Sequence, residues 1–396
     1  MQKKVAITGM GIISSIGNTV EENYNALISK KSGISDIEGF ATRHANEIKV
    51  GEIKKTNEEL QQFLNLPAEN TFTRTSLLGA YAAKQAVENA GITDINNVRS
   101  GLISSTSVGG MDFTEKHYKK YEEHPEYKKY ILSHNAGDSS NKIANYLGLK
   151  GFVSTISTAC SSAANAIMLG ASMIENGTLD RVIVGGTDAL SKFTINGFKT
   201  LMILSDTYNT PFDQNRKGLN LGEAAAYLVL ESDEVVQNEN KKVLGYVLGY
   251  GNANDAFHQT ASSENGEGAY LAMKQAFEQA SLLPDQINYI NAHGTATPNN
   301  DLSEGRALLR IFNNVPKFSS TKAFTGHTLA AAAAIEAVYS VLALQNNIVF
   351  PNLNFKTPME EFNLIPETEI LETEINYVLS NSFGFGGNCS TLIFGK

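Results

Sequence analysis

The chain has 396 residues, of which 42% are hydrophobic, so it can bury a large core as two domains or one double domain. Its formal net charge of −9 argues against nucleic acid as the main partner, and two cysteines are too few for a disulfide framework, which favours a reducing, cytoplasmic compartment. No Cys/His cluster suggests a metal, no signal-peptide core is expected, and the longest apolar stretch, residues 329–344, carries Glu336 and is short for a membrane span.

The first half of the chain alternates between strand-like and helix-like segments. It opens on a strand that runs from Val5 to the glycines at 9 and 11. Residues 111–145 are polar and aromatic, and we interpret them as an insertion with a solvated helical face. Further on, the β-branched run 153–156 stops at small residues, and helical spacing follows over 163–170. This pattern predicts a strand, a tight turn and a helix, with Cys160 at or just before the first helical turn.

Cys160 has two interpretations at this stage. A thiol at a helix N-terminus faces unpaired backbone N–H groups and the positive end of the helix dipole, and both favour the thiolate that attacks carbonyl carbons. Free cysteines are also among the most buried residue types, so Cys160 could equally be a structural residue. The segment alone does not separate these alternatives.

The second half of the chain repeats features of the first. The matched pairs are residues 4–11 with 243–251, the strand and turn before Cys160 with those before His327, and residues 181–186 with 377–380. Three matches in the same order predict an internal duplication of a β/α unit, with residues 1–240 as one half and 241–396 as the other. Strands alternating with helices predict an α/β fold with buried sheets.

Three further motifs carry chemical groups. His293 directly follows a strand-like run and precedes Gly294, a position where α/β folds collect their ligands. Lys322 and His327 lie in the loop before the alanine-rich helix, and the glycine-rich loop 383–388 can direct backbone N–H groups at an oxyanion. Each motif alone is weak, because a histidine, a lysine or a glycine turn is more often structural. Together with Cys160 they form a complete set for thioester chemistry.

At this point the chain resembles the elongating β-ketoacyl-ACP synthases, within the thiolase-fold condensing enzymes, over essentially its whole length. The resembling segments are Val5 to Gly11, Thr158-Ala159-Cys160-Ser161-Ser162, Pro211 to Gly218 with Glu223, His293-Gly294-Thr295 with Asp301 and Glu304, Lys322 with His327 and Glu336, and Phe383-Gly384-Phe385-Gly386-Gly387. The resemblance implies a thiolase-like fold in which two duplicated βα halves form an αβαβα layered sandwich.

The resemblance also implies a reaction: a decarboxylative Claisen condensation of an acyl thioester with malonyl-ACP, through an acyl-Cys160 intermediate, to give a 3-ketoacyl-ACP. His293 and His327 would stabilise the enolate as a neutral pair, and Lys322, paired with Glu336, would support the second histidine. The remaining implied roles are an oxyanion hole from the N–H groups of Cys160 and Phe385, pantetheine contacts from Thr295 and Thr297, and pocket or gate residues Phe383, Phe385 and Val108.

The implied partners are an acyl carrier protein and a second subunit. No cofactor is implied beyond the phosphopantetheine that carries the substrates. The second subunit would be either another copy of the chain, docked through the strand near residues 153–157, or a similar ketosynthase-like protein.

Three departures from the family pattern bear on the pathway. Asn388-Cys389 follows the glycines where the family usually has Thr-Asn, alanines follow Thr328 where many members have glycines, and Thr210 stands where an ACP-contacting arginine is common. They favour a specialised aryl-polyene, pigment or polyketide pathway over housekeeping fatty-acid elongation, which is the alternative. A non-catalytic chain-length partner would usually lack Cys160. A degradative thiolase, with Cys389 as second cysteine, fits the two-histidine-plus-lysine pattern poorly.

Overall fold

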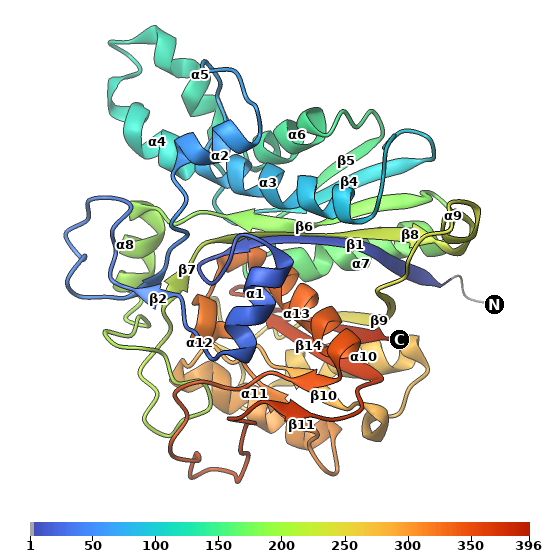
Figure 1. Ribbon diagram of the computed structural model, residues 1–396. Helices are drawn as coiled ribbons and strands as arrows, with labels where there is room; N and C mark the ends of the chain where they lie inside the picture. Colours follow the sequence, from blue (N-terminus) through green and yellow to red (C-terminus); the bar gives the residue numbers. More distant parts are fainter. Residues whose placement is uncertain (1–3) are drawn as a thin grey trace.

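The computed structural model describes residues 4–396, and its main feature is one mixed sheet with the strand order β11-β10-β14-β15-β9-β1-β8-β6-β4-β5 (Figure 1). The strands of this sheet are β1 (Val5–Ser14), β4 (Ser100–Ser105), β5 (Phe152–Ile156), β6 (Arg181–Asp188), β8 (Ala224–Ser232), β9 (Gly245–Asn254), β10 (Tyr289–Asn291), β11 (Lys317–Ser319), β14 (Tyr377–Phe383) and β15 (Asn388–Gly395).

The sheet consists of two halves with the same topology. Outward from the β1–β9 pair, the order β1-β8-β6-β4-β5 is matched by β9-β15-β14-β10-β11, and corresponding neighbours are parallel or antiparallel in the same way. The halves join where Val5 to Ile7 pair with Val247 to Gly245. All three matched features of the sequence occupy equivalent places, which confirms the duplication. The boundary at residue 240 stays a prediction.

The two halves of the sheet form two layers, and helices form three more, one between the halves and one on each outer face. In the middle layer, α7 (Ser162–Glu175) packs on β6 and β4, and α13 (Ala332–Asn346) packs on both β14 and β8. On the outer faces, α3 (Arg74–Asn89) covers β1 and β8, and α10 (Glu267–Ala280) covers β9 and β15 beside α11 (Pro298–Ile311). The arrangement is the expected αβαβα sandwich.

The remaining elements lie around these layers. They are α1 (Val20–Ile28), α2 (Asn57–Phe63), α4 (Met111–His117), α5 (Lys128–Ile131), α6 (Ala136–Tyr146), α8 (Lys192–Thr200), α9 (Asp233–Asn238), α12 (Lys322–Thr325), the short strands β2 (Ile34–Ser35), β3 (Val50–Gly51), β7 (Leu221–Gly222), β12 (Ile348–Val349) and β13 (Leu371–Glu372), and the 3-10 turns η1 (Tyr118–Lys120), η2 (Pro125–Tyr127), η3 (Leu132–His134), η4 (Pro284–Gln286) and η5 (Leu329–Ala331).

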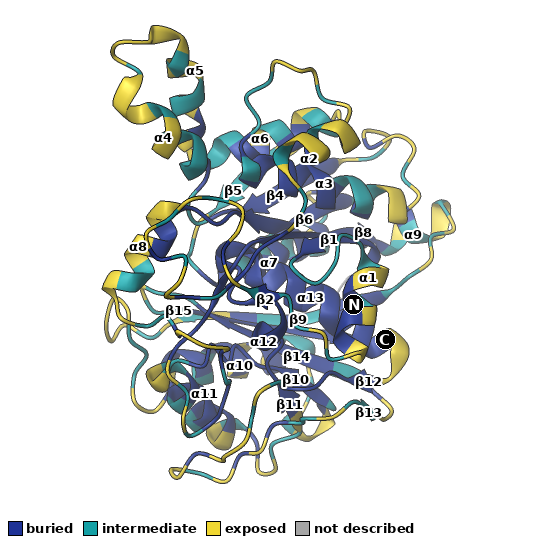
Figure 2. Cartoon of the chain, turned by 60° about the vertical axis from the view of Figure 1, so that its left-hand side comes forward, coloured by how far each residue is buried: buried dark blue, intermediate teal, exposed yellow. Residues whose placement is uncertain are grey.

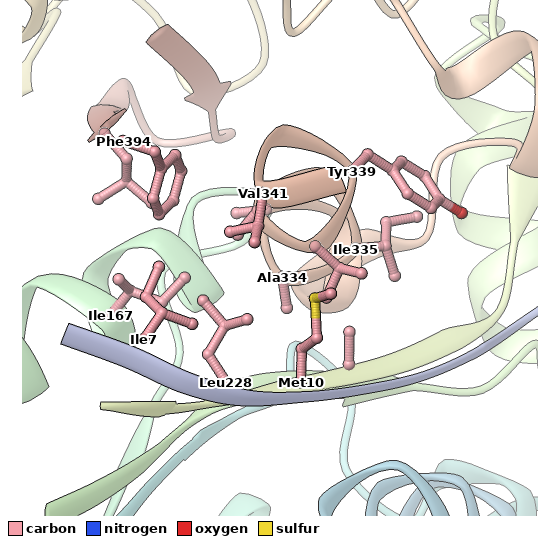
Figure 3. Close-up of a cluster of buried hydrophobic side chains, with 14 of the residues drawn as sticks. Ile7, Met10, Ile167, Leu228, Ala334, Ile335, Tyr339, Val341 and Phe394 are labelled. Atoms are coloured by element: carbon pink, nitrogen blue, oxygen red, sulfur yellow. The ribbon is translucent and has the colours of Figure 1, made fainter. Parts of the chain in front are cut away.

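The central helix α13 explains the alanine-rich run. The segment Leu329–Asn346 is long and apolar enough to cross a membrane, but 89% of it is buried inside the protein. Helices that are apolar all round are typical of a core layer. Figure 3 shows Ala334, Ile335 and Val341 of this helix facing Met10 and Leu228 from the sheet. The small alanine side chains let the helix approach the sheets on both sides.

The part of the 111–145 insertion that carries α4 and α5 projects from the layered body, whereas α6 packs on α3 (Figures 1 and 2). Its aromatic side chains pack on one another: the ring of His117 stacks on Tyr130 at 4.5 Å, and Phe113 meets Tyr130 edge-on at 5.2 Å. The segment is therefore more than the solvated helical face that we expected. It leads through α6 into β5, an edge strand whose Phe152 is 40% exposed. An open strand edge of this kind is able to pair with another chain.

Candidate active site

Cys160 lies in the tight turn between β5 and α7, as the sequence predicts. The turn depends on Ala159, which has a left-handed φ of +54°, and on Ser162, whose hydroxyl accepts from the Thr158 N–H at 2.8 Å and donates to the Ala159 carbonyl at 2.6 Å. Helix α7 begins at Ser162, so the Cys160 side chain stands just before its first turn, 6% exposed.

The protonation state of Cys160 differs from expectation. Burial raises the pKa of the thiol to about 11, although the charge of Lys322 and the backbone N–H groups of Phe385 and Cys160 act to lower it. The backbone N–H groups therefore act in the expected direction, but burial outweighs them and the thiol pKa lies above its ordinary value. The same observation brings two N–H donors, one from each half of the chain, to the sulfur, where an oxyanion would form.

His327 is held as a neutral donor. Its backbone N–H donates to the Asn220 carbonyl at 2.7 Å, and its Nδ1 accepts from the Leu329 N–H at 3.0 Å. With Nδ1 occupied as an acceptor, the proton of the neutral ring sits on Nε2. Burial, with a further contribution from the charge of Lys322, lowers the pKa of His327 to about 3. The imidazole is thus uncharged at neutral pH.

His293 is positioned by a buried carboxylate. It follows β10, and its backbone N–H and that of Gly294 donate to the two oxygens of Glu304 at 2.9 and 2.8 Å. Burial, Lys322 and His327 hold the pKa of His293 well below its usual value. The ring centroids of the two histidines lie 5.5 Å apart. The site therefore contains a pair of neutral imidazoles.

One buried ion pair influences all three of these groups. Lys322 Nζ bonds to Glu336 Oε1, and both side chains are almost fully buried. The Ser382 hydroxyl lies 3.5 Å from the other Glu336 oxygen. Burial raises the pKa of Glu336, against the opposing effect of Lys322. The positive charge of Lys322 disfavours protonation of both histidines and of the Cys160 thiolate, so a single cation acts on all three groups, in each case less strongly than burial.

Two cavities of about 290 Å³ each meet at Cys160. The entrance cavity opens beside the exposed Met202, and the sequence-predicted residues that line it are Cys160, His293, Thr295, Thr297, His327, Phe383 and Phe385. The apolar cavity is lined by Ser107, Val108, Ala159, Cys160, Phe193, Thr194, Gly197, Phe198, Leu201, Leu329 and Phe385. The hydroxyls of Thr295 and Thr297 lie 2.9 Å apart in the entrance cavity. The structure thus brings all the predicted site residues to this region, with Lys322 and Glu336 buried behind the histidines.

Phe198 is a site residue that the sequence did not indicate. It lies on α8, lines both cavities, and stacks on Phe385 with ring centroids 5.9 Å apart. The two rings therefore stand between the entrance cavity and the apolar cavity. Nothing in the local sequence of α8 distinguishes this phenylalanine from an ordinary packed residue.

Asp188 is a second residue that was missed. Its fully buried carboxylate accepts from the Ser107 N–H at 3.0 Å, the Ala330 N–H at 2.9 Å and the Thr106 hydroxyl. It fixes the wall of the apolar cavity to the segment after His327. An acidic residue at the end of the buried strand β6 was a signal that could have found it.

Comparisons with known proteins agree with this geometry. Residues 2–235 match the family described as Beta-ketoacyl synthase, N-terminal domain, and residues 244–356 match Beta-ketoacyl synthase, C-terminal domain. The chain is 33% identical over 413 residues to 3-oxoacyl-acyl-carrier-protein synthase 2 of Staphylococcus aureus. The alignment covers 100% of this chain and 98% of the relative.

Two solved structures share the whole fold, each covering 100% of both chains. One is the ishigamide ketosynthase/chain length factor, with a TM-score of 0.94 and 29% identity. The other is a complex of a type II PKS acyl-carrier protein with its ketosynthase bound to the hexaketide, with a TM-score of 0.89 and 26% identity.

Proposed function

The chain belongs to the β-ketoacyl synthase family, and we propose that it joins an acyl group held on Cys160 to a malonyl unit carried by an acyl carrier protein. The family, the fold and the class of enzyme, an acyltransferase that performs the 3-oxoacyl-ACP synthase condensation, were inferred from the motifs and are confirmed. The observation that carries the residue assignments is the position of Cys160, which lies where two cavities meet and faces two backbone N–H groups.

The first step is acyl transfer to Cys160. The sulfur attacks the carbonyl carbon of the acyl-ACP thioester, and the N–H groups of Cys160 and Phe385 bind the resulting oxyanion. Collapse breaks the bond to the pantetheine sulfur, which leaves with the proton that the Cys160 thiol gave up. The acyl chain then occupies the apolar cavity, and Thr295 and Thr297 contact the pantetheine arm in the entrance cavity.

The second step forms and uses the enolate. The thioester oxygen of malonyl-ACP accepts hydrogen bonds from His327 Nε2 and from His293, and the bond to the carboxylate breaks with loss of CO₂. Neutral imidazoles suit this step, because a charged imidazolium would protonate the carbon nucleophile. The enolate carbon then attacks the acyl carbonyl, and the Cys160 thiolate leaves to release a 3-ketoacyl-ACP.

We propose a specialised pathway and a two-subunit assembly. Both proposals are supported by the likeness to a ketosynthase/chain length factor and to a ketosynthase complexed with its carrier protein. The departures from the family pattern at Thr210 and Asn388 also favour a specialised pathway. The open edge of β5, with Phe152 exposed, is the surface that we assign to the second subunit, either another copy or a ketosynthase-like protein. Housekeeping fatty-acid elongation is the alternative, favoured by the Staphylococcus aureus relative.

Two measurements test these proposals. The purified chain is incubated with a panel of acyl-ACPs and malonyl-ACP, and intact-mass spectrometry locates the acyl group while product analysis follows the 3-ketoacyl-ACP. We expect acylation at Cys160, and acylation elsewhere would contradict the assignment. Preferred use of simple saturated primers would favour housekeeping elongation. Light scattering of the chain alone at micromolar concentration distinguishes a homodimer from a chain that awaits a different subunit.

A further inference from the structure

We propose that Asn388 is a positioning residue that holds the two oxyanion-binding N–H groups at a fixed separation. This inference rests on the proposed function, because it concerns the N–H groups of Cys160 and Phe385 that bind the thioester oxyanion. These groups come from opposite halves of the chain. Their separation therefore depends on whatever joins the turn before α7 to the glycine-rich loop before β15.

The side chain of Asn388 makes that connection. Its Oδ1 accepts from the Ser161 hydroxyl at 2.7 Å, from Asn165 Nδ2 at 2.8 Å and from Asn252 Nδ2 at 2.9 Å. Ser161 directly follows Cys160, Asn165 lies on α7, and Asn252 lies on β9. One amide oxygen thus joins the nucleophile turn and the central helix of the first half to a strand of the second half.

The hydrogen bonds around Asn388 continue into both halves of the chain. Asn165 Nδ2 also donates to the Thr158 hydroxyl at 2.8 Å, and the Ser161 hydroxyl also donates to the Thr158 carbonyl at 2.7 Å. On the other side, the Ser390 hydroxyl donates to Asn165 Oδ1 at 3.0 Å. Thr158 and Ser161 flank the turn that carries Cys160, so the network fixes the turn itself.

The loop that carries Phe385 is anchored at the same residue. The Gly384 N–H donates to the Asn388 carbonyl at 2.8 Å, which closes the loop on itself. The loop also lies against the nucleophile turn: a Cβ at Gly384 would stand 2.7 Å from the Thr158 carbonyl oxygen and 3.2 Å from the Cys160 nitrogen. A shift of Asn388 would therefore move the Phe385 N–H relative to the Cys160 N–H.

The choice of an amide has a chemical reason. The side chain provides a neutral oxygen acceptor for the three donors at 2.7–2.9 Å, with the Ser390 hydroxyl further away at 3.5 Å, and an Nδ2 that lies 3.3 Å from Asn252 Oδ1. A carboxylate could accept the same donors, but it would place a negative charge behind the developing oxyanion. Asn388 therefore joins the two halves without opposing the charge that the site must bind.

Two readouts on Asn388→Ala and one control variant test the inference. The rate of Cys160 acylation by acyl-ACP, measured by rapid-quench intact mass, should fall on the order of 10²-fold, because misplaced donors stabilise the oxyanion poorly. Malonyl-ACP decarboxylation in a Cys160→Gln background uses the histidine pair, so adding Asn388→Ala should change it less than twofold. Asn376→Ala is the matched control, since that half-buried side chain donates to the exposed Glu374, away from the nucleophile turn. It should match the unmodified protein in acylation.

A double-mutant cycle separates positioning from general loss of structure. Ser161→Ala removes the donor on the nucleophile turn, and it should slow acylation in the same direction as Asn388→Ala. If the two act through one link, the double variant should be slowed far less than the product of the single effects. The inference is overturned if Asn388→Ala acylates within threefold of the unmodified protein, if decarboxylation falls as much as acylation, or if the two effects simply multiply. Failure of the unmodified protein to acylate or condense would instead refute the proposed function.

Discussion

Removal of the His327 imidazole tests the division of labour between the thiol and the histidines. The background is Cys160→Gln, which has no thiol to acylate and whose amide oxygen can accept from the N–H groups of residues 160 and 385. Condensation should be absent in this background. Malonyl-ACP decarboxylation should persist, because it needs only His293, His327 and an open entrance cavity.

The magnitude follows from the geometry of His327. Its Nδ1 accepts from Leu329, so its Nε2–H is one of two imidazole donors to the enolate oxygen. Loss of one such donor costs about 3–4 kcal/mol, or roughly 10²–10³ in rate. His327→Ala in the Cys160→Gln background should therefore slow decarboxylation by that factor. His327→Gln, which can place an amide N–H near the Nε2 position, should recover part of it.

The assay is release of CO₂ from malonyl-ACP alone, followed across pH. Because burial lowers the pKa of His327 to about 3, the decarboxylation rate should show no loss attributable to this histidine between pH 5 and 8. The Ala variant also leaves the buried Leu329 N–H without its acceptor, at a cost of about 1–3 kcal/mol in stability, so a melting curve must show that it is folded at the assay temperature. Unchanged decarboxylation in His327→Ala, or condensation by Cys160→Gln, would refute the reasoning.

Three other outcomes are expected. Iodoacetamide should abolish condensation by modifying Cys160, faster as pH rises toward its pKa of about 11 and slower with acyl-ACP bound, whereas loss of activity through Cys389 alone would contradict the assignment. Val108→Phe should fill part of the apolar cavity and shorten the acyl chains in the product profile while acetyl-length priming continues; an unchanged profile would remove Val108 from the pocket. Burial raises the pKa of Glu304 to about 7, so the folded state binds the carboxyl proton more tightly than the unfolded state does. The stability that this proton contributes to the folded state is fully present below pH 4.5 and is lost as pH rises through 7. The loss amounts to about 3 kcal/mol, and melting curves of Glu304→Gln between pH 4.5 and 7 should be flatter than those of the unmodified protein.

The sequence by itself indicated a duplicated α/β fold and a set of groups suited to thioester chemistry, and the family resemblance added the layered architecture and the condensation. Three patterns lie within short stretches of the sequence. They are the change from β-branched to small residues to helical spacing around Cys160, the end of the strand before His293, and the glycines before Asn388. Duplication appeared because matched elements recur in the same order. These features depend on short-range propensity and spacing, which a single sequence displays directly.

The tertiary structure decided the properties that depend on surroundings. Burial, not the helix end, sets the pKa of Cys160, and the fraction of a side chain that is buried depends on elements from across the chain. The proton on His327 is assigned to Nε2 because the Leu329 N–H donates a hydrogen bond to Nδ1 of the ring.

Long-range partners were equally invisible in the sequence. Phe198 meets Phe385, and Ser161 meets Asn388, only after the two halves close on each other. Periodicity reports which face of an element is buried, but it does not report which distant side chain lies opposite. The identity of the reactive groups was therefore local information, whereas their charge states and relative positions came from the packing of one half of the chain against the other.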